Sequence, residues 1–157
     1  MLWIPEDFSG FTQDSELVGK WVIEKAGGRY TQGATGIGII KDGKLEVGIM
    51  YDGFTGRGGS IMMSSRCDNP KATSKWFYWA IFDYPFNQLG VKRCSVLVHE
   101  NNERALNLNI KLGFVRDTVI KDYFPDGDAV LLAMYKKDCK WLKESRNDKT
   151  LGTRTTT

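Results

Sequence analysis

The chain has 157 residues, 41% of them hydrophobic and 26% charged, and its formal net charge is +3. This length and composition fit one globular domain with a substantial core and leave little room for a second domain. No apolar run approaches the roughly 18 residues needed to cross a bilayer, and the first residues lack the basic and apolar regions of a signal peptide. We therefore expect a cytoplasmic protein without a membrane partner.

The charge is unevenly placed along the chain. Residues 136–157 contain seven basic and three acidic side chains, so the remainder is nearly neutral. Residues 147–157 hold almost nothing apolar, which is typical of a disordered segment. We predict a single domain over residues 1–144 and a flexible basic tail over residues 145–157. A small basic excess is usually solvated, so nucleic acid is the weaker interpretation of the tail's partner.

The three cysteines are Cys67, Cys94 and Cys139. They form neither a CxxC motif nor the Cys/His spacing of a metal site. We expect reduced thiols, and neither a disulfide framework nor a zinc site.

The first half of the chain predicts a helix and a hairpin. Residues 2–4 could form a short edge strand that ends at Pro5. Residues 14–26 carry apolar side chains at helical spacing and meet Gly27-Gly28, which predicts a helix. Residues 36–40 and 45–51 have β-type patterns around Asp42-Gly43, a pair that suits a type I′ turn.

A glycine-rich loop over residues 51–59 precedes a short, central strand at residues 60–65. Residues 66–73 then lead to an apolar helix over residues 74–89, which we expect Pro85 to kink and Gly90 to end. Residues 76–82 leave no polar face over two turns. This helix is therefore buried on most sides or packs against a second copy of the chain.

The last third predicts a strand at residues 93–99, parallel to residues 60–65, and a helix that begins after Asn102. Residues 117–123 and 129–135 predict a closing hairpin around residues 124–128, followed by a short helix over residues 137–144.

The helix after Asn102 has both end signals, because Asn102 can cap its start and Gly113 suits the left-handed residue at its end. Its apolar arc holds Leu106, Leu108 and Leu112, with Asn109 in the middle of it. A buried carboxamide needs partners, which backbone, water or a ligand could supply.

The pattern Asn102, Ala105, Leu108 and Gly113-Phe114 resembles the acetyl-CoA-binding helix of the GNAT N-acetyltransferases. Within that family, the sequence also resembles the small GNAT-like proteins of tailed phages. The resemblance implies an α/β fold with a central mixed sheet and helices on both faces. It also implies acetyl-CoA as the acyl donor, wedged between splayed strands at residues 60–65 and 93–99. Asn102, Ala105 and Asn109 would lie along its pantetheine arm.

The family holds the pyrophosphate with the pattern Gln/Arg-x-x-Gly-x-Gly/Ala, and Arg66-x-x-Asn69-x-Lys71 matches it at the first position only. Asparagine tolerates the left-handed conformation that glycine supplies, and Lys71 adds a charge near a helix N-terminus. An ordinary polar loop with a helix cap is the alternative interpretation. The predicted cofactor ligands of this strand and loop are Met62, Met63, Ser64, Arg66, Asn69, Lys71, Ala72, Thr73 and Ser74.

Asn109 occupies the position where the family commonly has a tyrosine that protonates the departing thiolate. An amide cannot act as that acid, so another group supplies the proton, the thiolate leaves unassisted, or the protein is not a catalyst. Tyr123, Tyr51 and Tyr84 are candidate acids. The predicted catalytic set is His99, Asn109 and Tyr123.

Acetyl transfer also needs a neutral amine and a donor to the thioester carbonyl. His99, Glu100, Glu46 and Asp52 are candidate bases, and a backbone N–H near Met63 or Ser64 is the candidate donor. The resemblance places the acceptor over residues 27–36 and 123–128, where three aspartates would favour a cationic amine: Asp122, Asp126 and Asp128.

Three functions follow as hypotheses. The first is an acetyl-CoA-dependent N-acetyltransferase that acts on a primary amine of a small molecule or protein. The second is a catalytically degenerate GNAT-like fold that serves as a binding module. The third and weakest is a nucleic-acid-associated module that binds through the basic tail.

Overall fold

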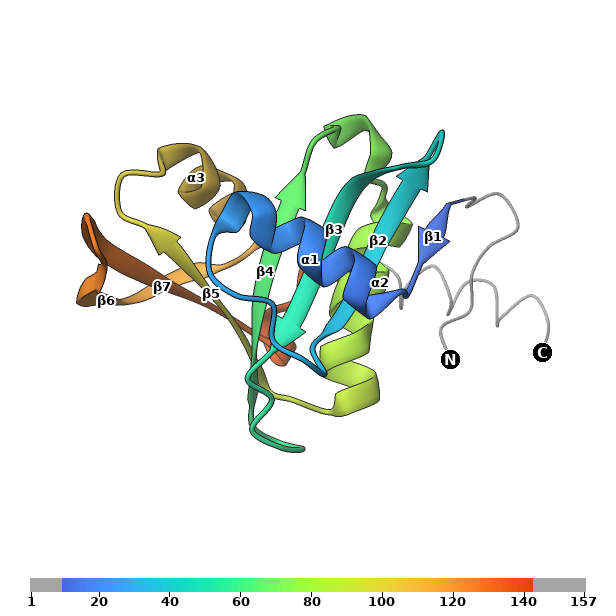
Figure 1. Cartoon of the computed structure of the whole chain (residues 1–157). Coiled ribbons are helices and arrows are strands. Elements are labelled where there is room, and N and C mark those ends of the chain that lie inside the picture. The colour runs from blue at the N-terminus through green and yellow to red at the C-terminus, as the bar shows by residue number, and fades with distance from the viewer. Residues whose placement is uncertain (1–9, 143–157) are drawn as a thin grey trace, which may run out of the picture.

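The computed structural model describes residues 10–142, which form one seven-stranded mixed sheet in the order β1-β2-β3-β4-β5-β7-β6. Helix α1 lies on one face of the sheet and α2 on the other (Figure 1). The mixed α/β class with helices on both faces is therefore confirmed. The strand predicted at residues 2–4 and the tail at residues 145–157 lie outside the described residues.

The first four elements confirm the predicted helix and hairpin. Both turn residues have positive φ, 52° at Asp42 and 76° at Gly43, as a type I′ turn requires. Strand β1 was not predicted, and it extends the edge of the sheet by pairing with β2. The elements are β1 (Phe11–Thr12), α1 (Ser15–Ala26), β2 (Thr35–Lys41) and β3 (Lys44–Asp52).

Glycines in β2 and β3 form the surface on which α1 packs. Gly38 and Gly48 lie opposite each other, and a Cβ on Gly48 would lie 2.9 Å from Val18 Cγ1. Because neither residue has a side chain, α1 approaches the sheet closely enough to bury Val18 and Val22 completely.

The substitution Gly48→Ala should therefore push α1 away from the sheet and lower the free energy of unfolding by about 1–3 kcal/mol. Urea denaturation measures this change. The control is Gly43→Asn in the exposed hairpin turn, where asparagine accepts positive φ and no heavy atom lies within 4 Å of the added Cβ. A Gly48→Ala protein as stable as the control would contradict the close packing.

The middle of the chain forms β4 (Ser60–Cys67), η1 (Pro70–Ala72), α2 (Lys75–Asp83), η2 (Tyr84–Leu89) and β5 (Arg93–His99). Strand β4 is longer than predicted, because Arg66 and Cys67 still pair with β3. At Tyr84, one residue before Pro85, the α-helix gives way to the π-helical η2, and Gly90 ends that segment in the left-handed conformation. The predicted end at Gly90 is confirmed, and the interruption predicted at Pro85 takes the form of this change of helix type.

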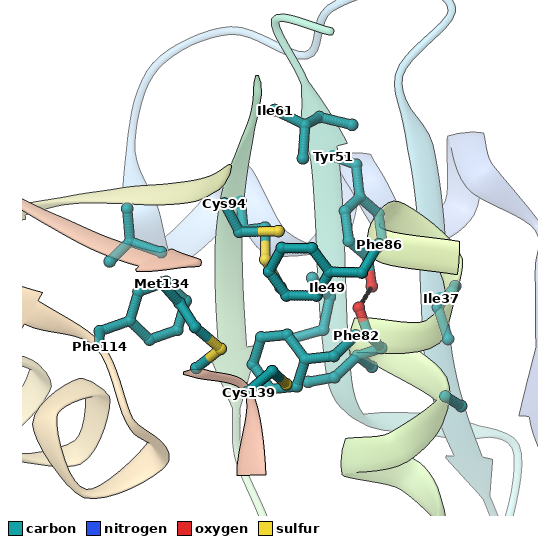
Figure 2. Close-up of a cluster of buried hydrophobic side chains, with 14 of the residues drawn as sticks. Ile37, Ile49, Tyr51, Ile61, Phe82, Phe86, Cys94, Phe114, Met134 and Cys139 are labelled. Atoms are coloured by element: carbon teal, nitrogen blue, oxygen red, sulfur yellow. Dashed lines mark hydrogen bonds between the residues drawn. The ribbon is translucent and has the colours of Figure 1, made fainter. Parts of the chain in front are cut away.

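Helix α2 and the η2 segment after it place large aromatic side chains in the main core (Figure 2). Phe82 and Phe86 are fully buried, and the Phe82 ring lies 6.0 Å from that of Phe114. The apolar side chains of residues 79–82 therefore face the chain's own sheet. They are not available to a second copy.

The last third of the described residues forms α3 (Glu103–Leu112), β6 (Val115–Phe124), β7 (Gly127–Tyr135) and η3 (Lys136–Asp138). The closing hairpin is longer than predicted, and its turn is reduced to Pro125-Asp126, because pairing resumes at Phe124 and Gly127 after a register shift. A 3₁₀ turn replaces the predicted start of the last helix, residues 140–142 are helical, and residues 143 and 144 of the prediction lie outside the described residues. Cys139 is buried as expected.

Candidate active site

Strands β4 and β5 run parallel, but they pair only at their first residues. The pairs are Ser60 with Arg93, Ile61 with Cys94 and Met62 with Ser95. Beyond these pairs β4 continues along β3, whereas β5 follows β7, and the two strands diverge (Figure 1). The predicted splay is therefore present in the structure.

The diverging part of β4 leaves backbone groups facing the gap. In an antiparallel pair, every second residue directs its N–H and C=O away from the partner strand. After Met62, β4 pairs with β3 alone in the described chain, so its other side offers donors to a bound molecule. Met63 and Ser64, the predicted source of such a donor, are the first residues of this stretch.

The loop after β4 holds the predicted phosphate ligands. Asn69 has φ −138°, which is extended and not left-handed, and its side-chain oxygen accepts from the Lys71 N–H. The expectation that Asn69 replaces a left-handed glycine is therefore wrong, because this side chain caps the η1 turn instead. Lys71 is exposed and forms no ion pair within residues 10–142.

The N-terminus of α2 lies at the end of this loop. Ser74 caps the helix by accepting from the Phe77 N–H, and Thr73 Oγ1 donates to the Pro70 carbonyl. The Ser74 hydroxyl proton and the first N–H groups of α2 can still donate to an anion. Ala72 is buried below this surface.

Arg66 is directed toward α1. Its guanidinium donates to both oxygens of Asp68 and to the Trp21 carbonyl, and it lies 4.1 Å from the Trp21 ring. The hydrogen bond that Arg66 donates to the Asp68 carboxylate is the main cause that raises the pKa of Arg66. Arg66 thus joins β4 to α1 and orients Asp68 at the start of the loop.

Helix α3 begins where β5 ends. Asn102 Oδ1 accepts from the Ala105 N–H at 3.1 Å, and Gly113 ends the helix with φ 116°. Both predicted end signals are confirmed. The apolar arc is narrower than predicted, because Leu106 is buried but Leu108 is 46% exposed.

Asn109 is half-buried and donates from Nδ2 to the Ala105 carbonyl at 2.9 Å. Its amide donor is therefore satisfied by backbone, which is one of the alternatives that the sequence left open.

Replacing Asn102 with alanine should remove the cap of α3 and lower the free energy of unfolding by about 1 kcal/mol. Asn102→Asp retains an acceptor at the same position and should keep that stability. Thermal or urea unfolding of the two variants tests the cap, and equal losses in both would argue against it.

Both ring nitrogens of His99 already have partners. Nδ1 accepts from the Asn101 N–H at 3.1 Å, so the neutral ring carries its proton on Nε2 and donates it to Asp126 at 3.0 Å. The ring also stacks on Phe124. In this arrangement His99 fastens the end of β5 to the β6–β7 turn, and a catalytic role would require one of these bonds to open.

Among the other candidate bases, Asp52 has the most suitable position. It lies opposite Met62, the last residue of β4 that pairs with β5, and accepts from Thr31 Oγ1 at 3.4 Å. Glu46 lies at the other end of β3, and Glu100 accepts from the Asp128 N–H.

The three candidate tyrosines differ in availability. Tyr51 is buried and donates to the Ile81 carbonyl at 2.6 Å, and burial raises its pKa well above the usual value. The Tyr84 hydroxyl is bonded to Thr35. Tyr123 is 50% exposed, but β7 separates its strand from β5.

Strands β4 and β5 are parallel and part after three pairs, and a helix follows each of them. This arrangement is the acyl-CoA N-acyltransferase fold of the GNAT proteins. Solved structures of N-acetyltransferases share it. The ribosomal-protein-S5-alanine acetyltransferase of Vibrio fischeri is 17% identical with a TM-score of 0.58, over 68% of this chain and 63% of that one. A chimera of the Vibrio cholerae spermidine N-acetyltransferase SpeG is 13% identical with a TM-score of 0.63, over 86% and 99%.

The N-acetyltransferase PseH of Campylobacter jejuni, solved in complex with acetyl coenzyme A, is 17% identical with a TM-score of 0.50, over 68% of this chain and 70% of that one. The match spans less than two thirds of the length of the Vibrio fischeri enzyme. No protein-family model and no curated protein matches the sequence. The likeness to phage proteins finds no support in these comparisons.

Proposed function

We propose that this protein is an N-acetyltransferase that uses acetyl-CoA and transfers the acetyl group to a primary amine. The observation that carries the proposal is the divergence of β4 and β5 after Met62 and Ser95, with the N-termini of α2 and α3 following the two strands. A neighbour with this fold was solved with acetyl-CoA bound. We place the same ligand between the two strands here.

The residues present fit such a ligand. An exposed lysine, Lys71, stands beside the N-terminus of α2, where the Ser74 hydroxyl and the first backbone N–H groups of the helix would hold the diphosphate. The backbone of Met62, Met63 and Ser64 would bind the pantetheine amides. Further along the arm we place two residues of α3, Asn102 and Ala105.

The chemistry requires the amine nitrogen to attack the thioester carbonyl carbon. An N–C bond forms, the C–S bond breaks, and the proton lost from the amine finally resides on the coenzyme A thiol. We assign the first proton transfer to Asp52 and the stabilisation of the carbonyl oxygen to a β4 backbone N–H. Tyr123 remains the predicted donor of the proton that reaches the thiolate, and His99 remains a predicted alternative base.

Isothermal titration calorimetry with acetyl-CoA tests the binding step, with Lys71→Ala as the variant and Lys44→Ala in the exposed hairpin as its control. We expect the loss of one phosphate contact to weaken binding by about tenfold for Lys71→Ala. The control should bind like the unchanged protein. Absence of heat at high micromolar ligand would end the proposal.

The alternative is a GNAT-like fold that binds a partner without catalysis. Asn109 favours it, because an amide bonded to the Ala105 carbonyl cannot protonate a thiolate. A colorimetric assay of released coenzyme A thiol with a panel of amines separates the two functions. Binding of acetyl-CoA without thiol release from any amine would favour the binding module.

The remaining expectations belong to this proposal. No helix within residues 10–142 has the length and apolar character needed to span a bilayer. A cytoplasmic location and a homodimer stay predictions, and the tail that could contact nucleic acid lies outside the described residues.

A further inference from the structure

One half of the sheet has a face that no described helix covers. Helix α1 packs on β2, β3 and β4, whereas β5, β7 and β6 extend away from it (Figure 1). Leu97 and Leu131 lie opposite each other there, half-buried, and belong to neither of the two core clusters. We call this the open sheet face, formed by Leu97, Val115, Ile120, Ala129, Leu131 and Ala133.

The open sheet face is apolar and accessible. Val115 is 57% exposed and Ile120 is 37% exposed, while Ala129 and Ala133 form its floor. Its residues share one side of the sheet because Ala133 pairs with Val115 and Ala129 pairs with Ile120. It is a broad surface made by three neighbouring strands.

The open sheet face is continuous with the proposed reaction centre. The strand registers align Asp52, Met62, Ser95, Ala133 and Val115 in one row across five strands. Tyr51 faces the main core on the α2 side, so Asp52 and this row face the α1 side. With neighbouring strands about 4.8 Å apart, Ser95 lies roughly 10 Å from Asp52.

The far end of the open sheet face is acidic. Four carboxylates surround the β6–β7 turn, and none forms an ion pair with lysine or arginine within residues 10–142: Glu100, Asp122, Asp126 and Asp128. The Asp126 side chain is 81% exposed. At the other end, Arg93 is neutralised by Asp117. The surface thus complements a ligand that is partly apolar and positively charged at one end.

A small amine would need a concave site that surrounds it. The loop between α1 and β2 could enclose such an amine, but it consists of residues 27–34, of which only Ala34 is buried. An open apolar surface with an acidic end, lying beside the reaction centre, instead matches an extended polypeptide whose own side chains help to enclose the reacting amine.

From this geometry we infer that the acceptor is a polypeptide, with its amine at Asp52 and the basic residues beside it extending over the open sheet face to the acidic turn. The inference rests on the proposed function and names its substrate class. The structural neighbours do not decide the substrate class, because one is named for an alanine of a ribosomal protein as its acceptor and another is named for spermidine.

Thiol release at saturating acetyl-CoA tests the inference with three acceptors. They are a short peptide with one lysine between arginines, the same peptide with glutamates in place of the arginines, and spermidine. We expect the arginine-flanked peptide to have the highest kcat/KM and a marked decrease with added salt. Asp122→Asn, in which asparagine accepts the φ of 54°, should lower kcat/KM for that peptide alone.

A matched pair of variants tests the surface itself. Ile120 and Val119 are adjacent exposed residues on opposite faces of β6. Ile120→Gln should raise the KM for the arginine-flanked peptide by about five- to tenfold through lost apolar contact. Val119→Gln should leave the KM unchanged, and the affinity for acetyl-CoA should be the same in both variants.

Three outcomes would overturn the inference while the proposed function stands. Spermidine could have the same kcat/KM as the arginine-flanked peptide. Ile120→Gln and Val119→Gln could have the same KM for that peptide, or sedimentation could show a dimer that Ile120→Gln dissociates. Failure to bind acetyl-CoA is a different result, because it removes the proposed function together with the inference.

Discussion

The variant Asp52→Asn should lose about 10²- to 10⁴-fold in kcat, the usual contribution of a positioned general base. Asparagine has nearly the same shape, and its side-chain oxygen can still accept from Thr31 Oγ1, so the loop over residues 27–34 should stay in place. It cannot take the proton from the attacking amine. Steady-state kinetics with a reactive amine at saturating acetyl-CoA measures this loss.

The position of Asp52 makes the expected effect specific to turnover. Asp52 lies opposite Met62 on β3, whereas the groups proposed to hold the diphosphate follow β4. The affinity for acetyl-CoA should therefore be unchanged in Asp52→Asn, as measured by calorimetry. Asp42→Asn in the exposed β2–β3 turn is the control, and its kcat should stay within about twofold of the original.

The kcat of Asp52→Asn also decides between Asp52 and the other candidate bases. A kcat within about threefold of the original would exclude Asp52 as the base and return attention to Glu100 and His99.

The second large effect concerns stability. Phe82→Ala should lower the free energy of unfolding by about 3–5 kcal/mol, because the removed ring is fully buried and leaves a cavity. Its ring lies 6.3 Å from Phe86 and 6.0 Å from Phe114, so the cavity would open between α2 and the end of α3 (Figure 2). Urea denaturation followed by tryptophan fluorescence measures the change.

The matched control is Phe54→Ala, which removes a ring that is 47% exposed in the loop between β3 and β4. We expect a loss of no more than about 0.5 kcal/mol there. Since Phe114 follows directly on Gly113, Phe82→Ala should also loosen the end of α3. Hydrogen exchange in α3 that is as slow as in the unchanged protein would contradict this coupling.

The local elements could be predicted from the sequence because their signals lie within a few residues. Asp42-Gly43 specifies a type I′ turn through the φ values that its two residues accept. Asn102 and Gly113 mark the ends of α3 through one side-chain acceptor and one left-handed residue. The unbroken apolar run of α2 likewise predicted its burial in the core.

Some predictions about the candidate site needed partners that are distant in the sequence. Arg66 was predicted as a phosphate ligand, but the structure directs it to Trp21 and Asp68. Leu108 was placed in a buried arc, although α3 buries only Leu106 completely. Which neighbour a side chain meets depends on how helices pack on the sheet, and helical periodicity carries no such information.

The sequence by itself determined the order of most elements, the turn at Asp42-Gly43, the ends of α3 and the resemblance to the GNAT proteins, because those are properties of short segments. Only the tertiary structure decided that β4 and β5 part after Met62 and Ser95, that Asp52 lies at that point, and that the open sheet face continues from it. The physical reason is strand register. Pairing aligns residues from five strands far apart in the chain, and each alignment is fixed by the packing of both faces together.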